Sequence, residues 1–181
     1  MASLTMISDH HEVESPLLVW GGEGSSDGVT RSVEFTVFEK PIPLKRTVFL
    51  HKNKHSLTPR IVSPSNTAQS NFNRIARSVL QGEQVPFFVA GEGLFARLTF
   101  RLRRPNNHYV GNQRTNGVLK TEKVNAMPTG GDLDNLVKYA LDAMNNVVYA
   151  DDRQIIKVLT DKMWAEEQDS DGSTTVAIKN I

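Results

Sequence analysis

The chain has 181 residues, of which 39% are hydrophobic, and a formal net charge of +1. A chain of this length buries one core, so we expect one compact folded domain rather than two. The sequence contains no cysteine, which excludes disulfides, thiolate zinc sites and cysteine nucleophiles. A metal would be held by oxygen or imidazole, and a nucleic-acid surface would need locally concentrated positive charge.

Residues 1–31 are predicted to form a flexible leader that is acidic and rich in glycine, and residues 32–181 the folded domain. The leader carries five acidic side chains against one Arg or Lys, Arg31. It therefore fits neither a secretory signal nor a mitochondrial transit peptide. No apolar run approaches the roughly 20 residues that cross a bilayer. We expect a soluble, intracellular protein, cytoplasmic by default, with no membrane partner and no organic cofactor.

Hydrophobic periodicity predicts an α+β fold. Apolar residues alternate in 33–37 and 94–102 and recur at spacings of three and four in 65–81 and 133–145. Strands are expected near 32–37, 47–51, 94–103, 154–164 and 174–179, and helices at 65–81 and 133–145. A polar connection at 169–173 predicts a hairpin between the last two strands, and the polar stretch 105–131 a long loop. The expected architecture is a small, mostly antiparallel sheet with two helices packed on one side.

Carboxylates cluster around the second predicted helix. Asp132 and Asp134 lie at its start, and Lys138 and Asp142 follow Asp134 at intervals of four, so these three share one helix face. The pair Asp151-Asp152 comes shortly after the helix. If that pair folds back beside the helix start, three or four carboxylates converge. Such a cluster is stable only around a cation, and Mg²⁺ is the natural occupant, with Mn²⁺ as the alternative.

A simpler interpretation is open for each of these residues. Asp132 or Asp134 can be an ordinary helix N-cap, and Asp151-Asp152 a solvated turn. Lys138 can be a plain ion-pair partner of Asp134 on the helix surface. A calcium EF-hand is excluded, because the fifth and sixth positions counted from Asp132 are leucine and valine.

The ordered motifs resemble the RusA-type Holliday junction resolvases over residues 33–179. The resemblance is carried by Asp132-Leu133-Asp134-Asn135-Leu136-Val137-Lys138, by Leu141-Asp142-Ala143-Met144-Asn145, and by Tyr149-Ala150-Asp151-Asp152-Arg153-Gln154-Ile155. Upstream, the segments at 40–46, 104–109 and 119–120 resemble the family as well. The resemblance implies a RusA-like fold and a homodimer that cuts two opposed strands of a four-way DNA junction symmetrically, with Mg²⁺, in recombination and repair.

The resemblance also implies roles for individual residues. Asp132, Asp134 and Asp152 match the family's catalytic, metal-binding aspartates, with Asp151 as a weaker ligand. Lys138 matches its catalytic lysine, and Asn135 would orient a carboxylate. The chain departs from the family just before Asp132, where a basic residue is common and this sequence has Pro128-Thr129-Gly130-Gly131.

Basic side chains concentrate between residues 97 and 123, with one acid among them. We expect this surface to follow the phosphate backbone; a solubilising strand face is the alternative. The expected DNA-binding residues are Arg97, Arg101, Arg103, Arg104, Arg114 and Lys120.

Four functions are open. A resolvase is the leading one, followed by a related nuclease acting on flaps or other branched DNA, a junction-binding protein that does not cut, and a structural domain. A junction has two-fold symmetry, so a homodimer is expected. Leu141 and Phe100 are candidate interface residues, and each is equally a candidate for the core.

Overall fold

The computed structural model describes residues 30–44, 48–50, 60–62, 66–166 and 171–181. The expected leader therefore lies outside the described residues, apart from Thr30 and Arg31. The elements are β1 (Ser32–Val37), β2 (Val48–Leu50), β3 (Arg60–Val62), α1 (Asn66–Val79), β4 (Leu94–Leu102), α2 (Leu133–Met144), β5 (Ile155–Trp164) and β6 (Gly172–Asn180). Every predicted helix and strand has a counterpart, and β3, which pairs with β2 in a separate small sheet, was not predicted.

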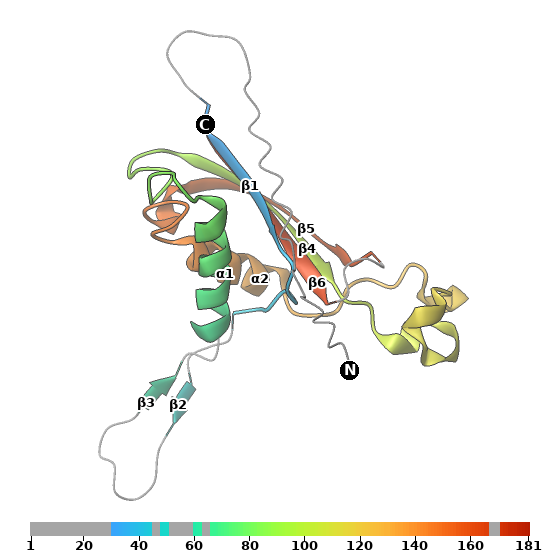
Figure 1. Cartoon of the computed structure of the whole chain (residues 1–181). Coiled ribbons are helices and arrows are strands. Elements are labelled where there is room, and N and C mark those ends of the chain that lie inside the picture. Colours follow the sequence, from blue (N-terminus) through green and yellow to red (C-terminus); the bar gives the residue numbers. More distant parts are fainter. Residues whose placement is uncertain (1–29, 45–47, 51–59, 63–65, 167–170) are drawn as a thin grey trace, which may run out of the picture.

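The main sheet has four strands in the order β1-β6-β4-β5. The pairs β1–β6 and β6–β4 are antiparallel, whereas β4 and β5 are parallel. Both helices lie on the same side of this sheet (Figure 1). The predicted α+β class, with a mostly antiparallel sheet and two helices on one side, is confirmed.

The predicted hairpin between the last two strands is wrong, because β4 lies between β5 and β6. All alternate side chains of β4 on one face are buried, from Leu94 to Leu102, so this strand gains most by taking a central position. A parallel partner can then be reached only by a crossover connection. The chain makes that crossover through α2, which places β5 at the outer edge.

The core lies between the helices and this face of β4. Leu98 of β4 and Leu136 of α2 are fully buried, as are Phe88 before β4 and Tyr149 after α2. Phe100 belongs to the same cluster with 1% of its surface exposed, so it is a core residue and not an interface residue. Leu141 packs against the core and is partly buried.

Helix α1 covers one end of the core. Phe72, Ala76 and Leu80 follow one another at intervals of four and are buried, as an amphipathic helix requires. The ring of Phe72 contacts Tyr139 of α2 edge-on, with centroids 6.3 Å apart. The Asn73 amide donates to the Ala143 carbonyl oxygen at 3.1 Å. These contacts hold α2 against α1.

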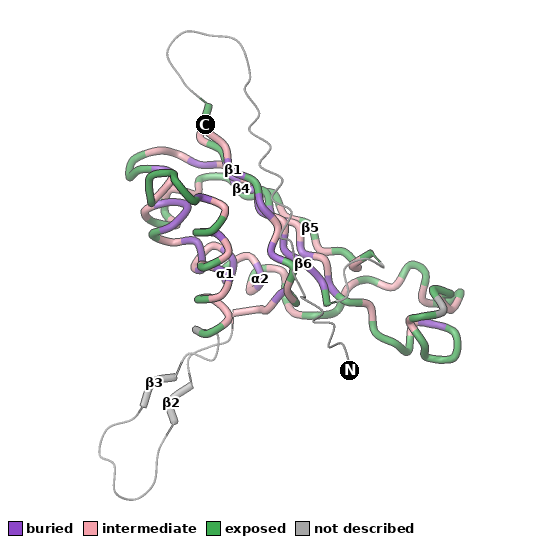
Figure 2. Tube along the Cα trace, viewed as in Figure 1, coloured by how far each residue is buried: buried purple, intermediate pink, exposed green. Residues whose placement is uncertain are grey.

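Between β4 and α2 the chain makes a long excursion away from the sheet (Figure 1). It contains four short 3₁₀ turns between residues 106 and 123 and one isolated bridge, Tyr109–Leu119. Figure 2 shows it mostly exposed, in contrast to the buried residues of the sheet. The described residues of the excursion include no strand and no α-helix, so the predicted long loop at 105–131 is confirmed.

The opposite face of the sheet has no described helix over it. Strand register puts Phe95, Arg97, Thr99 and Arg101 of β4 on this face, with Leu159 and Met163 of β5 beside the two arginines. We call it the open face. Among the described residues, no helix is both long enough and apolar enough to span a bilayer.

Replacing Val176 by alanine should destabilise the fold by about 1.5–3 kcal/mol, because this β6 side chain has no exposed surface. Val118→Ala is the matched control, since Val118 is 57% exposed in the excursion, and should change stability by less than about 0.5 kcal/mol. Equilibrium urea unfolding measures both. Equal losses in the two variants would contradict the assigned core.

Candidate active site

Asp132 is the N-cap of helix α2: its backbone is extended (φ −74°, ψ 140°), and its carbonyl accepts the first helical hydrogen bond, from the Leu136 N–H. Its carboxylate makes no capping hydrogen bond. Asp134 follows in the first turn, also exposed, where the helix dipole favours negative charge. Capping therefore does not account for Asp132, and two carboxylates at this helix start are accessible to solvent.

The residue before Asp132 has to be glycine. Gly131 has φ +91°, and a Cβ there would lie 3.1 Å from Pro43. Its carbonyl accepts a hydrogen bond from the Nζ of Lys162 at 2.9 Å. Lys162 reaches it from β5, so a distant segment supplies a cation at the point where the local sequence has none. No local sequence pattern would have revealed this residue.

The two consecutive aspartates after α2 have different surroundings. Asp151 caps a 3₁₀ turn: its carboxylate accepts from the Arg153 backbone N–H at 2.9 Å, and the Gln154 side chain accepts from the Asp151 N–H at 3.1 Å. The Arg153 N–H lowers the pKa of Asp151; burial opposes this shift, and a hydrogen bond with Asp152 and the charge of Arg153 add to it. Asp151 thus has a structural role, which favours Asp152 as the available ligand.

Asp152 lies near the second half of α2. Burial raises the pKa of the Asp142 carboxyl; Lys138 opposes this shift and Asp152 adds to it. Burial, then Asp152 and Asp142, also raises the pKa of Tyr149, whose hydroxyl donates to the Leu141 carbonyl oxygen at 2.7 Å. Asp142 therefore interacts electrostatically with Lys138, Asp152 and Tyr149. Its spacing of eight from Asp134 on one helix face was the signal for it.

The expected convergence of carboxylates is not seen. Among the described residues, no three Asp, Glu or His side chains are grouped so that one ion could be held. Like charges repel, by about 4 kcal/mol for a pair 4 Å apart at an effective dielectric of 20, which disfavours a tight trio. The donor chemistry does fit a hard cation, because Asp132, Asp134 and Asp152 offer oxygen ligands alone.

Asn135 lies beside these aspartates, and its backbone carbonyl accepts from the Leu44 N–H at 2.9 Å. This bond ties the first turn of α2 to the segment after β1. The residue is partly buried.

The predicted DNA-binding residues come from β4, from the two residues that directly follow it and from the excursion. Arg97 and Arg101 point to the open face, away from the helices, and Arg101 donates to the Thr175 hydroxyl at 3.0 Å. Arg114 and Lys120 belong to the excursion, where the Lys120 amine donates to the Asn112 side chain at 3.1 Å.

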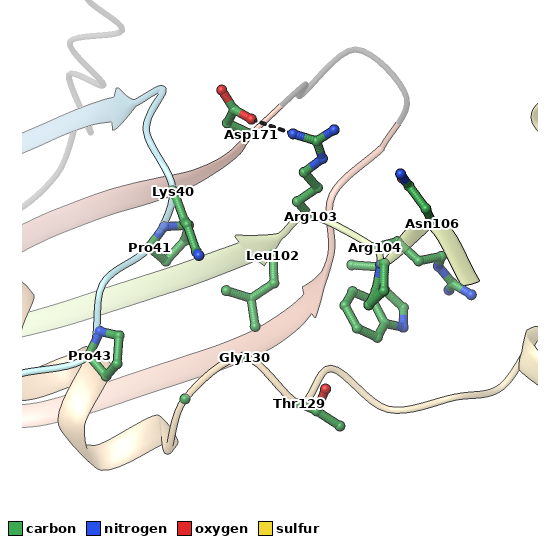
Figure 3. Close-up of a pocket in the computed structure, with 13 residues that line it drawn as sticks. Lys40, Pro41, Pro43, Leu102, Arg103, Arg104, Asn106, Thr129, Gly130 and Asp171 are labelled. Carbon is green, nitrogen blue, oxygen red and sulfur yellow. Dashed lines mark hydrogen bonds and ion pairs between the residues drawn. The ribbon is translucent and has the colours of Figure 1, made fainter. Parts of the chain in front are cut away.

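Arg103 and Arg104 instead border a hollow near the start of α2. Arg103 pairs with Asp171 at 2.8 Å, and Arg104 donates to the Lys123 carbonyl oxygen at 2.8 Å. The hollow has a volume of about 560 Å³ (Figure 3). Its lining comprises Lys40, Pro41, Pro43, Leu102, Arg103, Arg104, Pro105, Asn106, Thr129, Gly130, Gly131, Trp164 and Asp171.

Trp164, the last residue of β5, holds the excursion in place. Its indole N–H donates to the Ala126 carbonyl oxygen at 2.6 Å, and the Arg104 guanidinium lies 5.1 Å from its ring centroid. His108 contacts the ring edge-on, with centroids 5.4 Å apart. Burial, then the charges of Arg104, Lys123 and Lys120, lowers the pKa of His108 below its ordinary value, which favours the neutral ring.

A family model described as Endodeoxyribonuclease RusA matches residues 39–178. The match covers most of the chain and includes α2 and the 3₁₀ turn at Asp152–Gln154, where the aspartates lie. No individual curated protein matches the chain. The chain therefore belongs to the RusA endodeoxyribonuclease family, and it is a nuclease of the Holliday junction resolvase type.

Proposed function

We propose that this protein resolves four-way DNA junctions by Mg²⁺-dependent hydrolysis, cutting two opposed strands symmetrically in recombination and repair. The main support for this proposal comes from the start of α2. There the Asp132 carboxylate makes no capping hydrogen bond, and the exposed Asp134 follows two residues later. Mn²⁺ is the alternative ion, since it accepts the same oxygen ligands.

Asp132, Asp134 and Asp152 would hold the ion, with Asp151 as a weaker ligand because it caps a turn. When bound, the ion supplies Lewis-acid chemistry toward the phosphodiester and favours ionisation of an attacking water. Lys138 lies one turn after Asp134 on an exposed helix surface, where its ammonium stabilises the growing negative charge on the phosphate. Asn135 keeps a carboxylate oriented through its amide.

Cleavage of a synthetic four-way junction in Mg²⁺ tests these roles. Asp152→Asn should reduce the rate by at least about 100-fold, as loss of a charged ligand in a metal site does. Asp151→Asn is the matched control; its amide oxygen still accepts from Arg153, so cleavage should fall far less. Linear duplex and flap substrates are run beside the junction.

The outcomes separate the candidate functions. Paired symmetric nicks in the junction alone support a resolvase. Preferred cutting of the flap would identify a related branched-DNA nuclease, and junction binding without cleavage by the wild type a recognition protein. An equal loss of cleavage rate in the Asp151 and Asp152 variants would contradict the proposal that Asp152 is a principal ligand and Asp151 a weaker one.

DNA contacts are proposed for Arg97, Arg101, Arg103, Arg104, Arg114 and Lys120. The support is that Arg97 and Arg101 lie on a sheet face without a described helix, while Arg103 and Arg104 border the hollow beside the catalytic helix. Together these positions would let the two faces of one sheet edge contact different arms of a junction.

Replacing Arg97 and Arg101 together by alanine should flatten the salt dependence of junction binding, lowering the slope of log K against log salt by about two. Fluorescence anisotropy at several salt concentrations measures it. The α1 pair Arg74 and Arg77, both exposed, serves as the control and should leave the slope unchanged. An unchanged slope in both double variants would mean that the open face does not meet DNA.

A homodimer is also proposed, formed through the free edge of β5. Within the described chain this strand pairs on one side, with β4, and carries exposed apolar residues: Ile156, Val158, Leu159 and Met163. An unpaired apolar edge invites a further strand, and a two-fold pairing of β5 with its copy would present two sites to a two-fold symmetric substrate.

Val158→Lys should shift the protein toward monomer in sedimentation velocity at micromolar concentration, because an edge lysine disfavours strand pairing. Val124→Lys, at a similarly exposed valine in the excursion, should leave the mass unchanged. A wild-type protein that sediments as a monomer would refute the dimer.

A further inference from the structure

The hollow beside the start of α2 is lined by apolar and basic side chains, and none of its lining residues belongs to the proposed catalytic set. We propose that it holds one unpaired nucleotide of the branched DNA, with the base against its apolar wall and the phosphate at its basic rim. The inference rests on the proposed function and adds to it a structural reason for preferring branched DNA.

The wall of the hollow is apolar. Leu102 and Pro41 are buried and Pro43 is partly buried, and all three line it. A Cβ on Gly130 would come within 3.2 Å of the Leu102 side chain, and one on Gly131 within 3.1 Å of Pro43. These glycines let the backbone pass closely along the wall. An apolar wall can pack against the flat face of a base, whereas it offers no hydrogen bond or charge to a phosphate.

The rim of the hollow is basic. Lys40, Arg103 and Arg104 border it, against one acid, Asp171. Figure 3 shows Arg103 and Asp171 paired at one side, with Lys40 near the proline wall and Arg104 toward Asn106. The Arg103–Asp171 pair is largely exposed, with 51% and 67% of the two side chains accessible, so it contributes little stability and can yield to a phosphate.

Trp164 gives the hollow an aromatic side chain that is already held in place. Its N–H is bonded to Ala126 and the Arg104 guanidinium lies over its ring. Bases of single-stranded nucleic acid stack on such aromatic side chains without sequence preference. Because the indole loses little freedom on binding, more of the contact energy appears as affinity.

The position of the hollow connects it to catalysis. Gly131 lines it and directly precedes Asp132, the proposed ligand, and Lys162 holds the Gly131 carbonyl. A nucleotide seated here would bring its neighbouring phosphodiester to the start of α2. A linear duplex has to unpair and unstack a base to fill the hollow, at a cost of a few kcal/mol. The crossover of a junction offers bases that are freed more easily.

Junctions that lack a single base test the proposal. A tetrahydrofuran abasic site is placed at each crossover nucleotide in turn, and binding is measured by anisotropy without divalent metal. With the wild type, one position should weaken binding about fivefold or more, as expected for losing one stacked base. Thr129→Trp, an exposed residue that lines the hollow, should fill it and abolish that penalty.

Thr67→Trp is the control, since Thr67 is also exposed but lies on α1 outside the hollow; it should retain the full penalty. Asn106→Trp, a second residue lining the hollow, guards against a folding defect in Thr129→Trp and should also remove the penalty.

Three results would overturn the inference. If no abasic position weakens a junction that the wild type binds, the hollow takes no base, while the proposed function stands. If Thr129→Trp weakens intact and abasic junctions equally, the hollow holds a phosphate alone. If the wild type binds no junction at all, the proposed function fails together with the inference.

Discussion

The parallel pairing of β4 with β5 is the constraint on which the rest of this structure depends. Parallel neighbours cannot be joined by a tight turn, so the chain has to leave the end of β4 and return to the start of β5 by a long crossover. That crossover contains the excursion, the glycines, α2 and both aspartate segments. The proposed catalytic residues therefore all lie in one connection, and the antiparallel strands on the other side of β4 support it.

The crossover is held at several points along its length. Trp164 and Arg104 fasten the excursion to the ends of β5 and β4, Lys162 fastens Gly131, and Leu44 fastens Asn135. At the far end, Tyr149 is buried and bonded to Leu141. Trp164, Arg104, Lys162 and Leu44 all lie outside the aspartate motifs. This division leaves Asp132 and Asp134 exposed, while neutral and basic side chains provide the packing.

Much of the fold was predictable because periodicity reports burial directly. The alternation in β4 and the three-and-four spacing in α1 and α2 each placed an element correctly. Strand order was not predictable. A polar linker between β5 and β6 has the same sequence pattern whether the two strands are neighbours or a third strand, here β4, lies between them. The α2 motif predicted where Asp132 and Asp134 would lie, but the distances between side chains depend on repulsion and rotamers, which spacing does not report. Lys162 and Trp164 were missed because their roles arise from contacts between segments far apart in sequence.

The same physics links the dispersed carboxylates to substrate choice. Separate carboxylates cost the fold less than a tight trio would, since repulsion at short range is worth several kcal/mol. In the proposed mechanism, bringing them together would require positive charge from a bound ion and from groups such as Lys138. The phosphates of bound DNA would add negative charge near these carboxylates. The basic side chains of Lys40, Arg103 and Arg104 at the rim of the hollow would offset that charge. A substrate that occupies the hollow is held by contacts independent of the metal, and the binding energy of those contacts can be used to orient the phosphodiester at the start of α2.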